Sequence, residues 1–320
     1  MDALVVGIDL GGSKMLATVY RGAKALGSDK RTTDPTAGAR GLAMGLVGTV
    51  QAALEDAEVK RSAVAAIGIG APGPMDAQRG TLTGSPNLGV ADFPIRDCMQ
   101  DAFGVPVVVE NDVSAGTYGE HRFGAARGRR HVVGVFPGTG IGGGLVLDGR
   151  LYRGARGNAG EIGHMIMQLD GPLCGCGQYG CLEALASRSA IARDLIAQAA
   201  IGKAPAVAAK AGTDVRSVRS KMIARVLAAG EQPGVELLER AAERLGIGIA
   251  NCVNLLNPEM VVLGGGLVEK LGDWLIERAA DSMRRHALAS LAEGVEVVAA
   301  SLGDEAVVRG AAALAQESLA

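Results

Sequence analysis

The chain has 320 residues, a formal net charge of −2, and 48% hydrophobic but only 3% aromatic residues. This length suits about two domains, whose cores Val, Ile, Leu and Ala must fill. The near-neutral charge offers no basic surface for nucleic acid or an anionic membrane, and no apolar run approaches the length of a membrane span.

The first part of the chain alternates short apolar runs with helical patterns. Two strands, at 4–10 and 15–20, flank a glycine-rich turn and predict a hairpin. Apolar residues recur at helical spacing over 39–57. The further elements expected here are a strand at 64–70, a helix at 95–103, a strand at 105–110 and a helix at 112–123.

A second hairpin is predicted at 132–137 and 141–147, around the turn "GTGIGGG". The stretch 154–181 is rich in glycine and irregular, and a loop of that length inside a compact domain is usually functional. The later elements expected are helices at 183–200, over most of 214–256, at 267–285 and at 305–315, with strands at 260–263 and 295–299.

The two hairpins are similar in sequence. "VVGIDLGGSKMLATVY" and "VVGVFPGTGIGGGLVL" share the order strand, glycine turn, strand. This similarity favours two related lobes, each of alternating strands and helices around a mixed sheet, and therefore an α/β fold. The alternative is one α/β domain in which the similarity arose by chance.

Three glycine clusters stand at strand ends, where backbone N–H groups can face an anion without a Cβ in the way. They are "DLGGSK" at 9–14, "GTG" at 138–140 and "GGG" at 264–266. None is a P-loop or a clean dinucleotide fingerprint, and each alone could be a plain tight turn. Asp9 could orient Mg²⁺ through water or could simply stabilise its turn.

The sequence "VVVENDVSAG" places Glu110, Asn111 and Asp112 where a buried strand meets a helix. Ligands of α/β folds collect at such strand ends. Local sequence alone favours Asp112 as the helix cap. The functional alternative is a general base that takes the proton of a sugar hydroxyl during phosphoryl transfer, with Asn111 beside it to contact a diol.

Three of the five cysteines, Cys174, Cys176 and Cys181, lie close together, and His164 precedes them by ten residues. One imidazole and three thiolates suit a closed, structural Zn²⁺ site, whereas a redox pair would favour a C-x-x-C motif that is missing. Clustered thiols in an odd set also favour a reducing cytoplasm over a disulfide framework. The metal would bring together two flanking carboxylates, Glu161 and Glu183, which could contact sugar hydroxyls.

These segments resemble those of the ROK family of bacterial sugar kinases, repressors and uncharacterised proteins. The resemblance rests on "GTGIGGGLVLDGRLYRGARGNAGEIGH" followed by "CGCGQYGCLEA", and on "GIDLGGSK", "GAPGP", "SPNL" and "VENDVSAGTYGE" in the same order. It implies the actin-like ATPase (ribonuclease H-like) fold, with two lobes and a cleft between them. The lobes would be 1–117 plus 304–320, and 118–303, with the closing helix returning to the first.

The resemblance also implies roles for individual residues. Asp112 is the expected general base, and His164 would serve both zinc and sugar. The expected sugar contacts are Asn87, Asn111, Asp112, Glu161, His164 and Glu183. The expected ATP contacts are Gly11, Gly12, Ser13, Lys14, Gly138, Thr139, Gly140, Gly264 and Gly265. Asp9 joins these cofactor-binding residues through its expected role toward Mg²⁺, which its position beside the first turn suggests. The expected zinc ligands are His164, Cys174, Cys176 and Cys181.

The expected activity is ATP- and Mg²⁺-dependent phosphorylation of a hexose at its 6-hydroxyl, with glucose favoured, by a cytoplasmic homodimer. N-acetylmannosamine, N-acetylglucosamine and fructose are alternative substrates, and polyphosphate is an alternative donor. A sugar-responsive repressor of the same family is a weaker alternative, because the chain lacks a basic DNA-binding module before its first strand.

Overall fold

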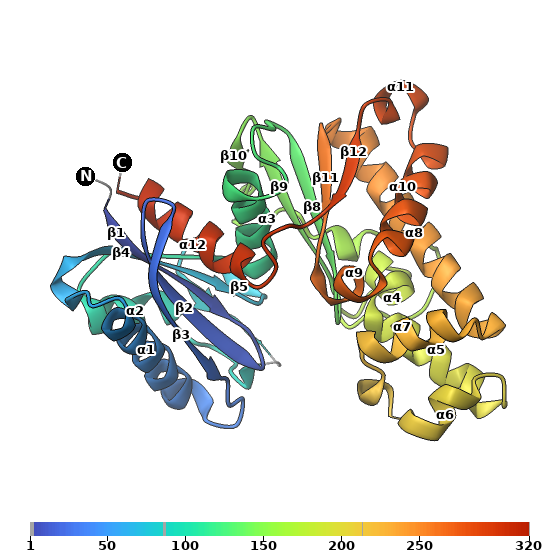
Figure 1. Cartoon of the computed structure of the whole chain (residues 1–320), viewed down its shortest axis with the longest axis horizontal. Helices are drawn as coiled ribbons and strands as arrows, with labels where there is room; N and C mark the ends of the chain where they lie inside the picture. The colour runs from blue at the N-terminus through green and yellow to red at the C-terminus, as the bar shows by residue number, and fades with distance from the viewer. Residues whose placement is uncertain (1–2, 86–87, 213, 320) are drawn as a thin grey trace. The chain divides into compact units, whose positions relative to one another are not determined.

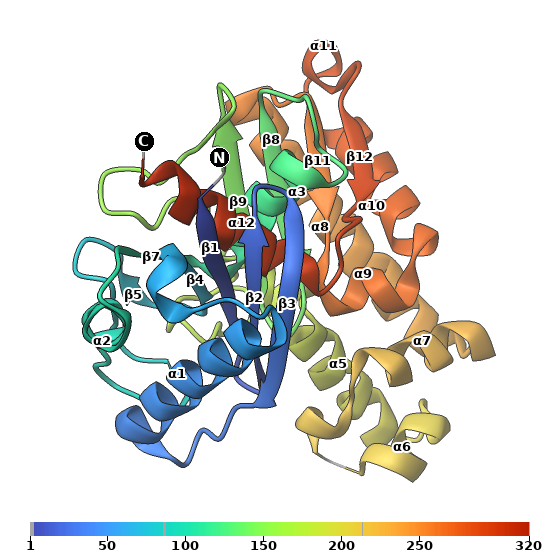
Figure 2. The ribbon, with the colours of Figure 1, turned by 60° about the vertical axis from the view of Figure 1, so that its left-hand side comes forward.

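The computed structural model describes residues 3–85, 88–212 and 214–319, which fold into two five-stranded sheets flanked by helices (Figures 1 and 2). The chain forms two compact units. Unit 1 comprises Met1–Arg130, Gly144–Gly160 and Ser301–Ala320, and unit 2 comprises His131–Gly143 and Glu161–Ala300. The division expected from the sequence, at 117/118 and 303/304, stays a prediction of domain limits.

The first sheet has the strand order β3-β2-β1-β4-β7. β1 pairs antiparallel with β2 and parallel with β4, and β4 pairs parallel with β7. Parallel strands covered on both faces are apolar along their whole length, which explains the unbroken Val/Ile/Ala runs. The strands are β1 (Leu4–Leu10), β2 (Lys14–Arg21), β3 (Lys24–Thr32), β4 (Val64–Ala71) and β7 (Val107–Asn111).

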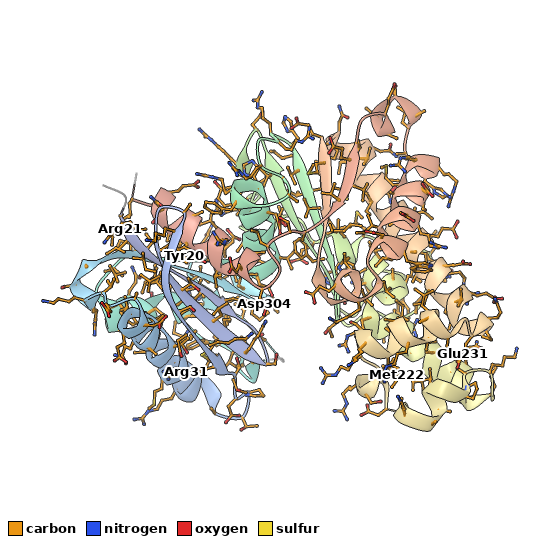
Figure 3. The ribbon with its side chains drawn as sticks, in the orientation of Figure 1. Tyr20, Arg21, Arg31, Met222, Glu231 and Asp304 are labelled. Atoms are coloured by element: carbon orange, nitrogen blue, oxygen red, sulfur yellow. The ribbon has the colours of Figure 1, made fainter. Side chains whose placement is uncertain are left out.

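Successive residues of β1 point to opposite faces of this sheet. Val6 and Ile8 belong to the core formed with α1 (Gly38–Asp56) and α2 (Ile95–Phe103). On the other face, Gly7 lies against α12 (Glu305–Glu317), where a Cβ would collide with the carbonyl of Val308. Tyr20, labelled in Figure 3, packs on that face with alanines of α12. Small residues thus let α12 lie directly on the sheet, beside α3 (Asp112–Phe123).

The second sheet repeats this topology. Its order is β10-β9-β8-β11-β12, and β11 pairs parallel with both β8 and β12. Ranked along the chain, both sheets have the order 3-2-1-4-5, which confirms the repeat predicted from the two hairpins. The strands are β8 (Val132–Pro137), β9 (Ile141–Leu147), β10 (Arg150–Leu151), β11 (Met260–Leu263) and β12 (Glu296–Ala299).

Two helices predicted as continuous are broken. The helix expected at 183–200 divides at Ser187, whose backbone is extended and whose hydroxyl accepts a hydrogen bond from the N–H of Ala190. The helix expected at 267–285 divides at Gly272, which has a φ of 56°. The resulting helices are α4 (Leu182–Ala186), α5 (Arg188–Ala200), α9 (Gly265–Leu271) and α10 (Asp273–His286).

The stretch predicted as mostly helical, 214–256, is divided at Gly230, and the other predicted elements agree with the structure within a few residues. β3, β10 and several short elements were not predicted. The remaining short strands are β5 (Met75–Asp76) and β6 (Thr81–Leu82). The remaining helices are η1 (Arg61–Ala63), η3 (Ile162–His164), α6 (Pro205–Ala211), η4 (Val215–Ser217), α7 (Ser220–Ala229), α8 (Gln232–Leu256) and α11 (Ala289–Ala292). Within the described ranges, no helix combines the length and apolar character needed to cross a bilayer.

Candidate active site

The turn between β1 and β2 is fixed by hydrogen bonds from the residue that follows β3. The hydroxyl of Thr33 donates to the carbonyl of Gly11 at 2.8 Å, and its backbone N–H donates to the carbonyl of Ser13 at 3.1 Å. The N–H of Gly11 donates to the carbonyl of Lys14 at 2.9 Å. The predicted phosphate turn is therefore a defined backbone loop supported from the sheet side.

Lys14 does not extend freely from this turn. Its Nζ lies 2.7 Å from the carboxylate of Asp304, just before α12 and labelled in Figure 3, and Lys30 approaches the same carboxylate at 3.2 Å. The hydrogen bond from Lys14 is the main reason that the pKa of Asp304 is lowered. Exposed pairs of this kind contribute little stability, so Lys14 can exchange Asp304 for another anion at small cost.

Asp9 lies at the carboxyl end of β1 and is largely withdrawn from solvent. Burial, and then the negative charge of Asp112, raise its pKa to about 7, against an opposing effect of Lys14. Burial and the neighbouring negative charge disfavour the ionised form of this carboxylate, and a nearby cation would favour it. The residue thus fits the predicted role of holding a hydrated Mg²⁺, which binds few protein ligands and keeps several waters.

The cap of α3 is Asn111, so the expectation that Asp112 caps this helix was wrong. Asn111 has extended backbone, and its Oδ1 accepts hydrogen bonds from the N–H groups of Val113 at 2.9 Å and Ser114 at 3.0 Å. Its amide oxygen is thereby committed, and its Nδ2 remains the group able to donate to a ligand. Asp112 occupies the first helical turn, with Oδ1 also 2.9 Å from the N–H of Val113.

Behind this junction lies Glu110, whose side chain is only 3% exposed. Its carboxylate accepts a hydrogen bond from Nε of Arg153 at 2.6 Å and from the N–H of Asn111 at 3.1 Å. Burial raises the pKa of Glu110, and Arg153 opposes that rise. Glu110 therefore orients the β7–α3 junction instead of facing solvent.

In unit 2, His164, Cys174, Cys176 and Cys181 place one ligand atom each within 4.8 Å of one another. Nδ1 of His164 lies 3.7 Å from Sγ of Cys174, and Sγ of Cys176 lies 3.7 Å from Sγ of Cys181. A tetrahedral zinc with ordinary Zn–S and Zn–N bonds would separate its ligands by about 3.6–3.8 Å. The donor set and its spacing fit a structural zinc ion.

The loop that carries the cysteines is held by turn hydrogen bonds and isolated bridges instead of a regular helix or strand. The N–H of Cys174 donates to the carbonyl of Gln178 at 2.8 Å, and that of Gly180 donates to Pro172 at 2.9 Å. Gly180, with a φ of 74°, passes so close to Gln168 that a Cβ would collide with its carbonyl. A metal ion bound to the cluster would constrain this irregular loop further and offset part of its ordering entropy.

The two acidic residues predicted to flank the cluster both contact it. Oε2 of Glu161 lies 3.9 Å from Nε2 of His164, so the imidazole has Nδ1 toward the thiols and Nε2 toward Glu161. Oε1 of Glu183 lies 3.5 Å from Sγ of Cys174, and its Oε2 accepts a hydrogen bond from the N–H of Ile141 at 3.0 Å. Glu183 therefore connects the cysteine loop to the turn between β8 and β9.

That turn contains Gly138, Thr139 and Gly140, and α5 holds it in place. The backbone N–H of Arg188 donates to the carbonyl of Gly138 at 2.9 Å, and its Nη2 donates to Oγ1 of Thr139 at 2.7 Å. The hydroxyl of Ser189 donates to the carbonyl of Thr139 at 2.7 Å. Arg188 and Ser189 were not predicted as site residues, since only a fold that brings α5 to the turn reveals them.

The third glycine cluster starts α9 beside the end of β8. The N–H of Gly264 donates to the carbonyl of Val135 at 3.1 Å, and Gly265 has a φ of 82°. A Cβ at Gly265 would lie 3.0 Å from the carbonyl of Pro137. The structure thus brings the second and third clusters together within unit 2.

The predicted site residues fall into two groups, each brought together within its own unit. Asp9, Gly11, Gly12, Ser13, Lys14, Asn111 and Asp112 belong to unit 1, and Gly138, Thr139, Gly140, Glu161, His164, Glu183, Gly264 and Gly265 belong to unit 2 with the cysteines. Asn87 lies outside the described residues.

Comparison with known proteins agrees with this geometry. The model of the ROK family matches residues 5–318. A glucokinase of Streptomyces coelicolor is 34% identical over 317 residues, covering 98% of both chains. The crystal structure of a ROK hexokinase from Thermus thermophilus matches with a TM-score of 0.85 and 38% identity over 99% of both chains.

A further match is the crystal structure of a ROK family glucokinase from Streptomyces griseus in complex with glucose and AMPPNP. It has a TM-score of 0.81 and 34% identity over 98% of this chain and 100% of that one. The fold of the chain is accordingly the actin-like ATPase fold of the ROK sugar kinases. From the family match over nearly its whole length, together with its duplicated sheets and His–Cys cluster, the chain belongs to the ROK family.

Proposed function

We propose that the protein is an ATP-dependent hexose kinase that phosphorylates the 6-hydroxyl, with D-glucose as its preferred substrate. The observation that carries this proposal is the similarity to a glucokinase bound to glucose and AMPPNP, at 34% identity over nearly the whole chain. It is supported by the polar groups at the β7–α3 junction and around the His–Cys cluster, which suit a polyhydroxyl substrate.

In the proposed reaction Asp112 is the general base. Its carboxylate accepts the proton of the sugar 6-hydroxyl as that oxygen attacks the γ-phosphorus. The bond from phosphorus to the β–γ bridging oxygen breaks, and ADP leaves with the electron pair. The products are glucose 6-phosphate, ADP and one proton, which Asp112 later releases to solvent.

Asn111 and Glu110 would keep this base in position. Asn111 uses its oxygen to cap α3, so only its Nδ2 is available to donate to a sugar oxygen. Glu110, bound to Arg153, fixes the backbone N–H of Asn111. Both contacts restrict where the first turn of α3, and therefore Asp112, can lie.

Asp9 would accept hydrogen bonds from the waters of a Mg²⁺ ion, which would supply positive charge to the phosphates of the donor. The turns at 11–14 and 138–140 would surround the phosphates with backbone N–H groups. Gly264 and Gly265 would allow close approach of the adenosine part. None of these roles requires a P-loop.

Zinc would be structural, because all four ligands come from the protein and leave no position for a catalytic water. With Nδ1 of His164 on the metal, Nε2 faces Glu161 and can contact a sugar hydroxyl. Glu161 and Glu183 would accept hydrogen bonds from further hydroxyls. We include Asn87 among the proposed sugar contacts on the family resemblance alone.

The test measures the sugar phosphate formed from glucose, mannose, fructose, N-acetylglucosamine and N-acetylmannosamine, with ATP or polyphosphate as donor. When ATP is the donor, ADP release is followed as well. We expect the highest kcat/KM for glucose with ATP, and glucose 6-phosphate as product. A preference for another sugar would correct the substrate and keep the reaction. If no sugar raises ADP release above the blank with ATP as donor, the proposal of an ATP-dependent kinase is wrong.

A further inference from the structure

Arg188 is the first residue of α5 and lies half-buried against the turn between β8 and β9. Its guanidinium donates from Nη2 to Oγ1 of Thr139 at 2.7 Å and from Nη1 to the carbonyl of Val218 at 3.4 Å. The side chain therefore reaches from the predicted phosphate turn to the residues that precede α7. All of these contacts lie within unit 2.

A second cation stands near it. Arg219 is the N-cap residue of α7, and its charge acts after burial to lower the pKa of Arg188. Over the described parts of the chain, neither guanidinium forms an ion pair with a carboxylate, and the nearby Asp214 pairs with Arg216 at 3.2 Å. Because Arg188 binds the carbonyl of Val218, the residue before Arg219, the two cations lie close together without a carboxylate of the described residues paired to either.

The position of both residues adds to this imbalance. Each arginine stands at the N-terminal end of a helix, α5 of 13 residues and α7 of 10 residues, where the helix dipole disfavours a positive charge. A bound anion would relieve the mutual repulsion and the unfavourable dipole together. The two cations at these helix ends therefore form a place where a negatively charged ligand would be favoured.

The surroundings of the pair are the nucleotide-binding candidates of unit 2. Thr139 belongs to the glycine turn at 138–140, and Ser220, next to Arg219, lies beside the third glycine cluster: a Cβ at Gly266 would be 3.5 Å from its hydroxyl. α7 and α9 pack together, as Figure 2 also shows. The cations thus stand next to both glycine clusters.

We propose that Arg188 and Arg219 form the cationic side of a phosphate site in unit 2, and that Arg188 also positions the hydroxyl of Thr139. The inference rests on the proposed function, because the anion is taken to be the phosphate chain of the donor. By donating to Oγ1, Arg188 leaves the hydroxyl hydrogen of Thr139 to donate to a phosphate oxygen. Its remaining N–H groups can donate to phosphate themselves.

A purely structural role for Arg188 makes a different prediction. If the residue only joins α5 to the turn, its removal should loosen the whole region. The affinity for adenosine should then fall as much as the affinity for AMPPNP. If Arg188 contacts phosphate, its removal should lower the affinity of each ligand more strongly the more phosphates that ligand carries. The comparison of adenosine, ADP and AMPPNP separates the two roles.

The experiment is calorimetric titration of the full chain with adenosine, Mg·ADP, Mg·AMPPNP and inorganic tripolyphosphate. The variants are Arg188→Ala, Arg188→Lys and Arg219→Ala. The control is Arg193→Ala on the same helix, whose guanidinium binds Asp194 at 2.8 Å and the carbonyl of Ala184 at 3.2 Å instead of the turn. Melting temperatures identify any variant that folds poorly.

We expect Arg188→Ala to weaken AMPPNP about 10- to 100-fold, the range for charge-assisted hydrogen bonds, and adenosine by less than twofold. Arg188→Lys should be intermediate, Arg219→Ala should weaken AMPPNP several-fold, and Arg193→Ala should bind as wild type. In steady-state assays Arg188→Ala should raise the KM for ATP and leave that for the hexose unchanged.

Unchanged AMPPNP binding in Arg188→Ala, an equal loss for adenosine, or no nucleotide or tripolyphosphate binding by the wild type would overturn the inference. If Arg188→Ala loses affinity equally for tripolyphosphate and AMPPNP, the phosphate site is supported for both ATP and polyphosphate. The donor that yields sugar phosphate in the kinase assay then identifies which of the two the protein uses. If nucleotide binding depends on Arg188 while no hexose is phosphorylated, the phosphate site stands and the kinase proposal fails.

Discussion

At the scale of single residues, the proposed chemistry depends on how the side chains around Asp112 hold the β7–α3 junction and the end of β1. Asn111 caps α3, Glu110 is bound to Arg153, and Asp9 is buried at the end of β1. Asp112 is the carboxylate of this group that the proposed reaction uses. Its role can be separated from that of its neighbours by a substitution that conserves its shape.

Asp112→Asn should reduce kcat by about 10²- to 10⁴-fold, because the amide keeps hydrogen bonds to the sugar but takes no proton. Hexose affinity, measured by calorimetry, should change by only a few-fold. The matched control is Asp101→Asn, an exposed carboxylate of α2, which should keep wild-type kinetics. Turnover near the wild-type rate in Asp112→Asn would remove Asp112 from the role of base.

At the scale of elements, the decisive feature is the irregular segment between η3 and α4. It has no strand or helix of its own apart from isolated bridges such as Ile166 with Cys181 and Leu173 with Tyr179. It also exposes large apolar side chains, with Leu169 at 84% and Tyr179 at 60%. Turn hydrogen bonds and a few buried residues, among them Cys174 and Cys181, hold the segment, and a metal ion on the His–Cys cluster would add a further constraint.

Cys176→Ser should lower zinc affinity by at least about tenfold, the scale seen when metal sites are perturbed. Cys176 is exposed, so little core packing is lost. With zinc lost, hexose affinity should fall while Mg·AMPPNP still binds, because the cluster orders Glu161 and His164. Elemental analysis gives the zinc content, and Cys98→Ser, outside the cluster, is the control. Full hexose affinity in zinc-free protein would contradict a structural role.

The same scale shows what the sequence could predict. Strands and helices that bury their apolar faces, such as 112–123 and 260–263, were predicted with the observed limits. The strand β3 was missed because it is an edge strand with a mostly exposed, polar sequence. The division at Ser187 was missed because the cap formed by its hydroxyl lies inside a run that is apolar on both sides.

Sequence motifs could predict which residues belong to the candidate site, but they could not predict the contacts between those residues. The four metal-ligand residues follow from their spacing and the resemblance, and the structure brings them together. Which residue caps α3 depends on backbone angles that local sequence does not fix, so the cap was assigned to Asp112 instead of Asn111. Arg188 belongs to no recognisable motif. The sequence shows only a cation at the start of a helix, and its contact with the turn at 138–140 is known only from the fold.

At the scale of the whole molecule, the same strand order occurs in both sheets, and the C-terminal helix packs on one face of the first sheet. α12 lies on β1 and β4, where a Cβ at Gly68 would collide with the carbonyl of Ala311. Asp304, just before this helix, receives Lys14 and Lys30 from β2 and β3. The stability of unit 1 is therefore coupled to the charges around Asp9, which lie at this edge of the sheet.

Stability should depend on pH through Asp9 when Mg²⁺ is absent. Its pKa is raised from 3.8 to about 7 in the folded protein, by burial and by Asp112, with Asp304 adding to the rise and Lys14 and Lys30 opposing it. The folded state therefore holds the proton more tightly than the unfolded chain does. The stabilising contribution of protonated Asp9 to folding is fully present below pH 3.8 and is lost as pH rises through about 7.

The measurement is urea unfolding of the chelator-treated protein between pH 4.5 and 7.5, with Asp9→Asn and the exposed control Asp101→Asn. Relative to Asp9→Asn, the wild type should lose at most about 1.4 kcal/mol per pH unit over this range. Asp101→Asn should follow the wild type. Adding Mg·AMPPNP should reduce the difference near pH 7, because a cation favours the ionised carboxylate. Parallel curves for the wild type and Asp9→Asn would show that Asp9 titrates normally, and the structural basis for placing a cation beside it would be lost.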